Sequence, residues 1–419
     1  MATSSLPYDI VGHIIDILAA EGDLTPVKNA SLASSSVLHL CRRHIFHTIS
    51  SYSNPPYQSL KKPFINLLVN NPAIVQYIRD LEYEVHHDDN QLSPFLPNLL
   101  HTISHLECLR IRSINVDWSE MDPLLRSTLL HLMYLPTVTH FVITRLRNIP
   151  ISAFAPCINL QQLDIRYITL APFEDQSPSL RTSRPETTPR ILHFRNVSSQ
   201  TAVERLLRAK WKDGRPVLDF SHLKTLVLDF NTFQDVPLTQ EIFENASYLE
   251  DLQINGMFTC QSYDLNFESD LCYSSVHNDT ESLAGLSEII SVNARNLRTL
   301  QVMTLLKGKR SHTLMIGLCE ELKTLAGNEV LQVLKFTFSM EGCESKALVE
   351  NAFRKLEEVL MDPGWSTLVC VSINIVVRCC YREVARLKLN SVPEKYFGRL
   401  SSRKILSYKW EDFVYNSVE

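Results

Sequence analysis

The sequence predicts an α/β solenoid in which short parallel strands alternate with outer helices, preceded by a small helical unit. Three observations predict this class: a short apolar phrase recurs along residues 106 to 371, helical patterns lie between its copies, and the first fifty residues carry helical stripes without the phrase. The chain has 419 residues, 45% of them hydrophobic and 21% charged, as in ordinary globular proteins. It is long enough to bury a large core.

The first fifty residues predict three helices. The first begins near Pro7 and ends before Gly22, and its single apolar face is expected to contain Val11, Ile14, Ile15 and Leu18. A second short helix is expected at Thr25, with Thr25 as its N-cap, and a third carries an apolar stripe around Cys41. Three helices of this length bury little surface alone, so the unit needs a partner or the rest of the chain.

The recurring phrase consists of an apolar residue, two variable residues, and an apolar pair flanking one variable residue. It predicts a short strand whose alternate side chains point inward, entered through a turn that buries the first apolar residue. Because the copies are unevenly spaced, they indicate an irregular leucine-rich-repeat solenoid. The copies are LECLRI from Leu106, VTHFVI from Val138, LQQLDI from Leu160, LKTLVL from Leu223, LEDLQI from Leu249, LRTLQV from Leu297 and LQVLKF from Leu331, with weaker copies at 190–195 and 365–371.

Four regions follow from this pattern. Residues 1–50 form the helical unit, 51–105 a linker and helical cap opened by SYSNPPY, 106–380 the solenoid, and 381–419 a C-terminal cap. The clearest helix between phrases is SKALVENAFRKLEEVL, with apolar residues at a period of 3.6. The Pro/Ser/Thr-rich segment 171–190 and the acidic segment 260–282 are expected to be loops within the repeats.

Charge and cysteine usage exclude several classes of partner. A net charge of −5 gives no general attraction to nucleic acid or to an anionic membrane, so neither is expected as a partner. We expect no secretion signal. No apolar run of the sequence approaches the ~20 residues that are needed to span a bilayer. The ten cysteines contain no C-x-x-C pair, which indicates reduced thiols in the cytoplasm or nucleus.

No motif for an enzyme or a cofactor site is present. The eleven glycines form no dinucleotide-binding, P-loop or nucleophile-elbow motif, and H-E-x-x-H is absent. The densest ligand-like cluster, His86-His87-Asp88-Asp89, is expected to be a solvated loop, so no metal, cofactor or catalytic residue is assigned. A hydrolase built from non-contiguous residues stays open, because such sites are recognised by geometry.

The chain resembles the F-box-like proteins of mushroom-forming fungi, which join an F-box to divergent leucine-rich repeats. Leu6-Pro7 with Ile10, Ile14 and Leu18 is similar to the L-P-x-E-I-x-x-x-I-x-x-x-L opening of that family. ASLASSSVLHLCRRHIF is similar to its second half, although Val37 stands where many F-boxes carry Trp, and ITRLRNIPISAFAPCINLQQLDIRYITL is similar to its repeats.

The resemblance implies a substrate-recognition subunit of a cullin-type ubiquitin ligase. In this hypothesis the F-box docks on a Skp-type adaptor and the repeats hold a target protein. The implied adaptor-binding residues are Leu6, Pro7, Ile10, Ile14, Leu18, Leu32 and Val37. Two alternatives remain: an interaction scaffold without a ubiquitin link, whose first helices only pack on the chain's own next helices, and the remote case of a hydrolase.

The strand phrases also predict where a target binds. Residues between the inward positions of each phrase point to the opposite face of the sheet, which solenoids use for recognition. The predicted target-binding residues run from basic to acidic along the chain: Arg110, Arg112, Arg166 and Arg195, then Asp229 and Asp251. As exposed residues, the first three arginines are expected to matter little for stability.

Overall fold

The computed structural model describes twelve stretches of the chain, namely residues 7–51, 61–86, 96–114, 116–173, 187–195, 200–230, 235–256, 285–292, 295–307, 310–341, 346–378 and 389–412. Most of SYSNPPY and of the 171–190 segment, all of the 260–282 segment, Leu6, and residues 87 to 89 lie outside these stretches. The chain divides into two compact units: Met1–Pro189 with Val197–Asp219, and Arg190–Asn196 with Phe220–Glu419. Each unit is described by itself.

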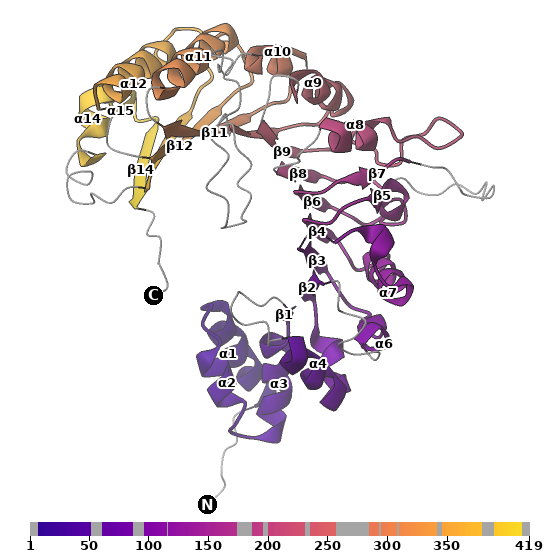
Figure 1. The fold of residues 1–419 in the computed structure, drawn as a ribbon. Helices are drawn as coiled ribbons and strands as arrows, with labels where there is room; N and C mark the ends of the chain where they lie inside the picture. The colour runs from indigo at the N-terminus through magenta and orange to yellow at the C-terminus, as the bar shows by residue number, and fades with distance from the viewer. Residues whose placement is uncertain are drawn as a thin grey trace, which may run out of the picture. The chain divides into compact units, whose positions relative to one another are not determined.

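The first unit begins with a three-helix bundle (Figure 1). Its helices are α1 (Tyr8–Ala20), α2 (Thr25–Ala30) and α3 (Ser35–Ile45). Gly22 follows α1 with a φ of 85°, a value that glycine adopts without strain. The N-cap of α2 is Leu24 and not the expected Thr25; the Asp23 carboxylate accepts from the Thr25 backbone N–H at 2.9 Å instead. Ser34 caps α3 by accepting from the Val37 N–H.

Parallel strands follow the bundle in the first unit. Their order is β1 (Thr48–Ser50), β2 (Asp80–Val85), β3 (Cys108–Ser113), β4 (His140–Thr144) and β6 (Gln162–Arg166), and each pairs in parallel with the next. A two-stranded sheet of β5 (Ile149–Pro150) and β7 (Leu170–Ala171) accompanies them. The helical segments are α4 (Lys61–Asn70), η2 (Pro72–Tyr77), α6 (Leu96–His101), η3 (Trp118–Glu120), α7 (Pro123–Met133), η4 (Ile151–Phe154) and α8 (Gln200–Arg208).

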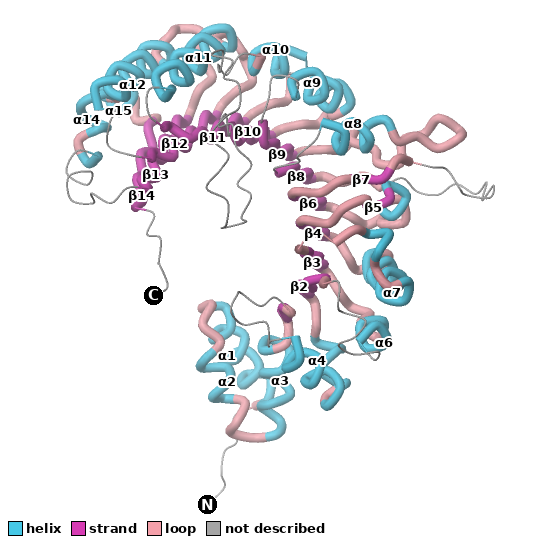
Figure 2. The backbone as a smooth tube through the Cα atoms, viewed as in Figure 1, coloured by secondary structure: helices cyan, strands magenta, loops and turns pink. Residues whose placement is uncertain are grey.

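The second unit repeats the same arrangement with longer strands. Figure 2 shows its strands side by side, with helices α9 to α12 along one face. In order, the strands are β8 (Ile191–Arg195), β9 (Thr225–Phe230), β10 (Asp251–Gly256), β11 (Thr299–Lys307), β12 (Val333–Glu341), β13 (Cys370–Arg378) and β14 (Leu406–Asp412), all paired in parallel. The helices are α9 (Asp235–Asn245), α10 (Leu286–Val292), α11 (Arg310–Leu325), α12 (Lys346–Leu360), α14 (Val392–Tyr396) and α15 (Gly398–Ser402).

The core of each unit lies between strands and helices. In the second unit Phe336 and Phe338 of β12 are fully buried, and Phe338 and Phe353 of α12 are 5.7 Å apart between ring centroids. Phe353 also packs against Tyr396 and Phe397. Aromatic rings at such separations add to the stability gained from burial. The apolar stripe predicted for α12 is therefore the side that covers the sheet.

The α/β leucine-rich-repeat solenoid predicted from the sequence is confirmed. Each strong phrase became a strand that begins two residues after its first apolar residue, and that residue is buried in every case, from Leu106 to Leu331. Strands also occur where none was expected: β2 lies within the 51–105 region assigned to a linker and helical cap, β14 within the 381–419 cap, and β1 at the end of the 1–50 unit.

Candidate functional site

The first helix of the bundle is apolar on two sides. Its inner side contributes Ile15, which forms the bundle core with Val27 and Cys41. Its outer side carries Ile10, Ile14 and Ile17, which recur at positions i, i+4 and i+7 of the helix and are exposed. The grouping of Ile14 with Val11, Ile15 and Leu18 on one inward face is therefore wrong, because the 100° step between residues turns Ile14 away from Ile15.

We call the exposed set the apolar face of α1; its members are Ile10, Ile14 and Ile17. Ile14 is 43% exposed, and Leu32, which follows α2, is 85% exposed. Pro7 is exposed as well. Leu18 and Val37 lie elsewhere, partly buried against the bundle core. Of the implied adaptor-binding residues that are described, Pro7, Ile10, Ile14 and Leu32 are thus open to contact, whereas Leu18 and Val37 help to hold the bundle together.

A polar contact fixes α1 against α3. Both Arg43 and His44 of α3 reach the Asp16 carboxylate, His44 through Nε2 at 2.8 Å. Burial favours the protonated acid, but the hydrogen bonds and the positive charges of His44 and Arg43 together outweigh it, so the pKa of Asp16 lies below its ordinary value. This contact lies beside the apolar face and orients α1 within the bundle.

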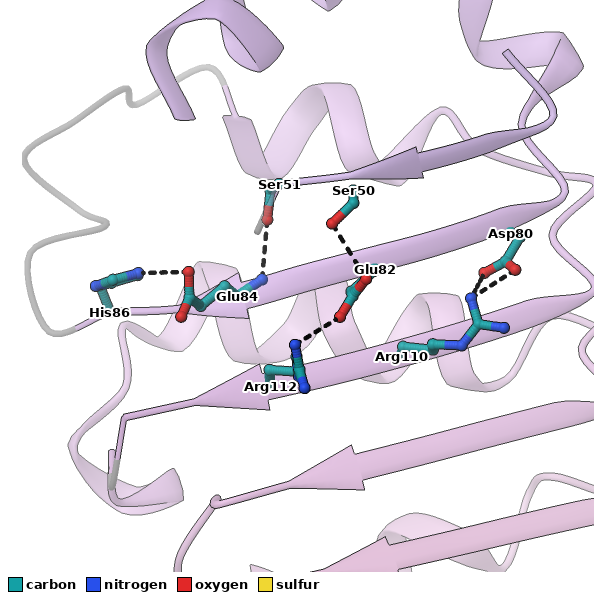
Figure 3. A network of polar contacts seen from close by, with 8 residues as sticks. All are labelled: Ser50, Ser51, Asp80, Glu82, Glu84, His86, Arg110 and Arg112. Carbon is teal, nitrogen blue, oxygen red and sulfur yellow. Dashed lines mark hydrogen bonds and ion pairs between the residues drawn. The ribbon is translucent and has the colours of Figure 1, made fainter. Parts of the chain in front are cut away.

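The strand face of the first unit is ionic. Figure 3 shows Arg110 and Arg112 of β3 leaning toward acidic side chains of β2. Arg110 Nη1 donates to both Asp80 oxygens at 2.5 Å, and Arg112 Nη1 lies 3.2 Å from Glu82 Oε1. In the β2–β3 register Glu82 stands opposite Arg110, so each arginine pairs diagonally with the acid two positions nearer the strand start.

Further ionic contacts lie along the same face. In β6, Arg166 makes a bidentate pair with the buried Asp164, through Nε at 2.9 Å and Nη2 at 2.5 Å. We use "ionic strand face" for Asp80, Glu82, Arg110, Arg112, Asp164 and Arg166. The three predicted arginines do lie on the outward side of their strands. Each of the three is paired with an acid of its own unit, so the expectation that they matter little for stability needs a direct test.

Burial also shifts proton equilibria on this face. It lowers the pKa of Arg110, but the hydrogen bond to Asp80 and the nearby charges, those of Asp80 and Glu82 among them, together outweigh burial, so the pKa is above its ordinary value. Burial raises the pKa of the neighbouring Cys108 thiol to about 11, with Asp80 contributing in the same direction. Cys108 is therefore protonated near neutrality and is not a nucleophile of the thiolate kind.

A buried carboxylate lies where β2 ends. Glu84 is 5% exposed, and its Oε2 is 3.2 Å from Nε2 of His86 (Figure 3). The Glu84 backbone N–H donates to Ser51 Oγ at 2.9 Å. The arrangement ties the end of β1 to β2.

The remaining predicted target-binding residues belong to the second unit. Arg195 ends β8 and is half-buried, with no hydrogen-bond partner for its Nε among the described residues. Asp229 of β9 accepts from Asn255 Nδ2 at 2.6 Å. Asp251 is the first residue of β10 and is half-buried. Arg110, Arg112 and Arg166 of the first unit are thus paired with acids of that unit, and target binding by this set of residues stays a prediction.

The sequence analysis did not predict Asp80 and Glu82 of β2 as the acidic partners of Arg110 and Arg112. The signal for that strand was present, because Ile78, Leu81 and Tyr83 fit the recurring phrase and all three are fully buried. Recognising that copy would have placed Asp80 and Glu82 on the outward side, next to the arginines. Ile17 of the apolar face was also missed, because a stripe on the solvent side of a helix has the same period as a core stripe.

Comparisons with known proteins assign no family. No family model matches the chain, and no curated protein matches its sequence. Among solved structures, an internalin from Listeria monocytogenes aligns with a TM-score of 0.29 and 12% identity, over 82% of this chain and 69% of the internalin chain. The fold is established by the strand register given above and not by this likeness.

In the described stretches, no helix is long and apolar enough to span a bilayer. Over the same residues, no group of three or more His, Cys, Asp or Glu side chains is placed to hold a metal ion.

Proposed function

We propose that this chain is a non-enzymatic substrate-recognition subunit of a cullin-type ubiquitin ligase that acts in the cytoplasm or nucleus. In this proposal the N-terminal bundle docks on a Skp-type adaptor and the repeats hold a target protein. The observation that carries the proposal is the apolar face of α1. The resemblance of residues 5 to 49 to an F-box supplies the identity of the partner.

Covering the apolar face of α1 with a partner would gain hydrophobic free energy. Its members Ile10, Ile14 and Ile17 are among the large apolar side chains that remain exposed, and so is Leu32 after α2. Full burial of one aliphatic side chain is worth about 1.5–3 kcal/mol, so a partner that covers several of them gains enough to dock stably. Contiguous exposed apolar groups on a small helical unit are typical of an interaction site.

A specific observation favours a second candidate. Leu18 and Val37 correspond to positions that the family resemblance assigns to the adaptor, yet they pack partly inward against Val27 and Cys41. In this second candidate, Leu18 and Val37 stabilise the bundle itself, and the bundle only caps the end of the repeats. The chain would then be an interaction scaffold without a link to ubiquitin.

Adaptor binding of the full chain distinguishes these candidates. Purified Skp-type adaptor is immobilised, and binding of the wild type is compared with that of Ile10→Glu/Ile14→Glu. Glutamate keeps helix propensity, so α1 should still form, while two charges in a packed apolar interface should weaken binding by at least about a hundredfold.

The matched control is Val369→Glu, which places the same charge on an apolar side chain that is 62% exposed in the second unit. It should bind like the wild type. Circular dichroism and thermal unfolding verify that all variants are folded. If the wild type binds no Skp-type adaptor, the scaffold candidate holds; if the double variant binds as well as the wild type, the apolar face of α1 is not the docking surface.

A further inference from the structure

Three residues of the first unit hold a backbone conformation that L side chains rarely adopt. Among the described residues of that unit other than glycine, Arg145, Asn148 and Tyr167 have positive φ values, of 58°, 54° and 53°. This left-handed region is accessible to asparagine but costs free energy for most other side chains, and a bulky aromatic residue there is an outlier. Asn148 therefore suits its position, whereas Arg145 and Tyr167 stand where glycine or asparagine would be more stable.

Arg145 and Tyr167 occupy equivalent places in neighbouring strands. Arg145 directly follows β4 and Tyr167 directly follows β6, and the Arg145 N–H donates to the Arg166 carbonyl at 2.9 Å, which extends the pairing of the two strands. Ile114 directly follows β3, the other neighbour of β4, and its φ is not positive. A strand of this sheet can thus end without the left-handed turn. Two unfavourable residues at adjacent strand ends indicate a role beyond the fold.

The guanidinium of Arg145 has no acidic partner among the described residues. It lies over the Tyr167 ring, with 5.6 Å between the guanidinium carbon and the ring centroid. A cation–π contact leaves the N–H donors of a guanidinium available for hydrogen bonds. Its side chain makes no hydrogen bond or ion pair with another described residue. Arg110, Arg112 and Arg166, by contrast, each have an acid of their own unit.

This corner of the first unit is open to solvent. Ile114 is 57% exposed and Tyr167 is 45% exposed, and Arg145, on the strand between theirs, is half-buried. Tyr and Arg are the residue types that, with Trp, contribute most at protein interfaces, because an aromatic ring supplies apolar area and a guanidinium supplies a fork of donors. We call Ile114, Arg145 and Tyr167 the strand-end site.

The charge at the strand-end site selects the ligand. One available guanidinium matches one carboxylate, which accepts two of its N–H groups. Phosphorylated peptides are bound by clusters of arginines, and nucleic acids require several cations at once. Here the arginines of the ionic strand face are already paired, and Arg147 stands opposite Asp117. A single carboxylate is therefore the better match.

The two flanking side chains select the source of the carboxylate. Ile114 and Tyr167 lie on strands at either side of the strand that carries Arg145. A peptide that continues past its acid in both directions can cover both side chains with apolar residues of its own. A C-terminal carboxylate bound to Arg145 would leave one of them uncovered. The arrangement therefore favours an acidic side chain within a chain.

We propose that the strand-end site binds an Asp or Glu side chain of a partner protein, held by Arg145 and flanked by apolar residues that cover Ile114 and Tyr167. The bound segment crosses the ends of β3, β4 and β6. The inference deepens the proposed function and rests on it only in that the repeats hold a target protein. Unlike the arginines of the ionic strand face, Arg145 reaches a partner without breaking an ion pair of its own unit.

The test is peptide selection on the immobilised full-length protein, with a random peptide library displayed on phage as the probe. The library is first passed over the variant Arg145→Asn/Tyr167→Asn, which removes peptides that bind elsewhere, and is then selected on the wild type. Enriched peptides should carry Asp or Glu next to apolar residues. Made synthetically with an amidated C-terminus, they should still bind, and they should bind more weakly at high salt.

Variants of the protein separate recognition from stability. Arg145→Gln should weaken binding of the synthetic peptides by at least about tenfold, as should replacement of the peptide's acid by its amide. The matched control is Arg147→Gln, which removes the charge of a nearby exposed arginine and should bind like the wild type. Because asparagine tolerates the left-handed region, Arg145→Asn/Tyr167→Asn should keep or raise the Tm of the wild type while it loses the peptide.

Several outcomes overturn the inference: no peptide is enriched on the wild type over the double variant, the enriched peptides lack an acid, or their binding survives Arg145→Gln or is lost equally with Arg147→Gln. A decrease in Tm of more than about 2 °C for the double variant also overturns it, because the two side chains would then be structural. Adaptor capture on the same preparations reports separately on the proposed function, so either can fail while the other holds.

Discussion

The Arg110–Asp80 ion pair can be tested with Arg110→Glu, because the sequence and the structure predict different results for this variant. As an outward residue of a solvated strand, it should tolerate charge reversal with little loss of stability. In the structure its guanidinium contacts both oxygens of Asp80, and Glu82 stands opposite it in the register. Arg110→Glu removes the ion pair and places a third carboxylate beside two others.

The size of the effect follows from distance and exposure. Two unit charges at 4 Å interact by about 4 kcal/mol at an effective dielectric constant near 20. Arg110 is 37% exposed, so solvent screening reduces this value toward the range of about 0.2–1 kcal/mol measured for exposed pairs. Loss of the attraction together with the new repulsion should therefore cost about 2 kcal/mol, whereas Arg110→Gln should cost less than about 1 kcal/mol.

Thermal unfolding by calorimetry measures this difference. For a unit of roughly 150–250 residues, 2 kcal/mol corresponds to a decrease in Tm of about 4–8 °C. The decrease should shrink at high salt, and the swap Asp80→Arg/Arg110→Asp should recover part of it. An unchanged Tm for Arg110→Glu would refute the reasoning, because it would mean that the pair does not form in solution.

Three further predictions concern packing and pH. Gly364→Ala should lower the Tm of the second unit, because an added Cβ would meet the backbone N of Gly327 at 2.9 Å, whereas Gly398→Ala, with no atom within 4 Å, should not. Phe353→Ala, at a side chain that is 2% exposed, should cost about 3–5 kcal/mol in chemical denaturation of that unit. Asp16→Asn should destabilise the bundle at neutral pH but not in acid, as Tm measured against pH would show. The pKa of Asp16 is lowered in the folded protein. Its contribution to stability is therefore present above the unfolded pKa of about 3.9 and is lost as pH falls through the folded pKa.

The strands could be predicted from sequence because their signal is local. A phrase such as LQVLKF fixes the turn, the start of the strand and the buried side in six residues, and Leu331, Leu334 and Phe336 are all buried as it requires. Strand β2 follows the same rule from Ile78, but three acids and a tyrosine within it weakened the leucine signal. A short strand such as β1 has no room for the phrase, so only pairing with β2 defines it.

The candidate surfaces were harder to predict because they depend on partners distant in sequence. Outward direction follows from strand alternation, and Arg110, Arg112 and Arg166 do point outward. Whether an outward arginine is open to a ligand depends on its neighbours across the sheet, and Asp80 lies thirty residues from Arg110.

Strand β1 has a practical consequence for dividing this protein. Its three residues pair with Asp80, Leu81 and Glu82, and His47 just before it accepts the backbone N–H groups of Arg79 and Asp80. A fragment that starts at residue 51 would leave this edge of β2 bare, with unpaired backbone groups that invite association between chains. A fragment that lacks only the helical bundle should therefore begin after Phe46, so that β1 stays paired with β2.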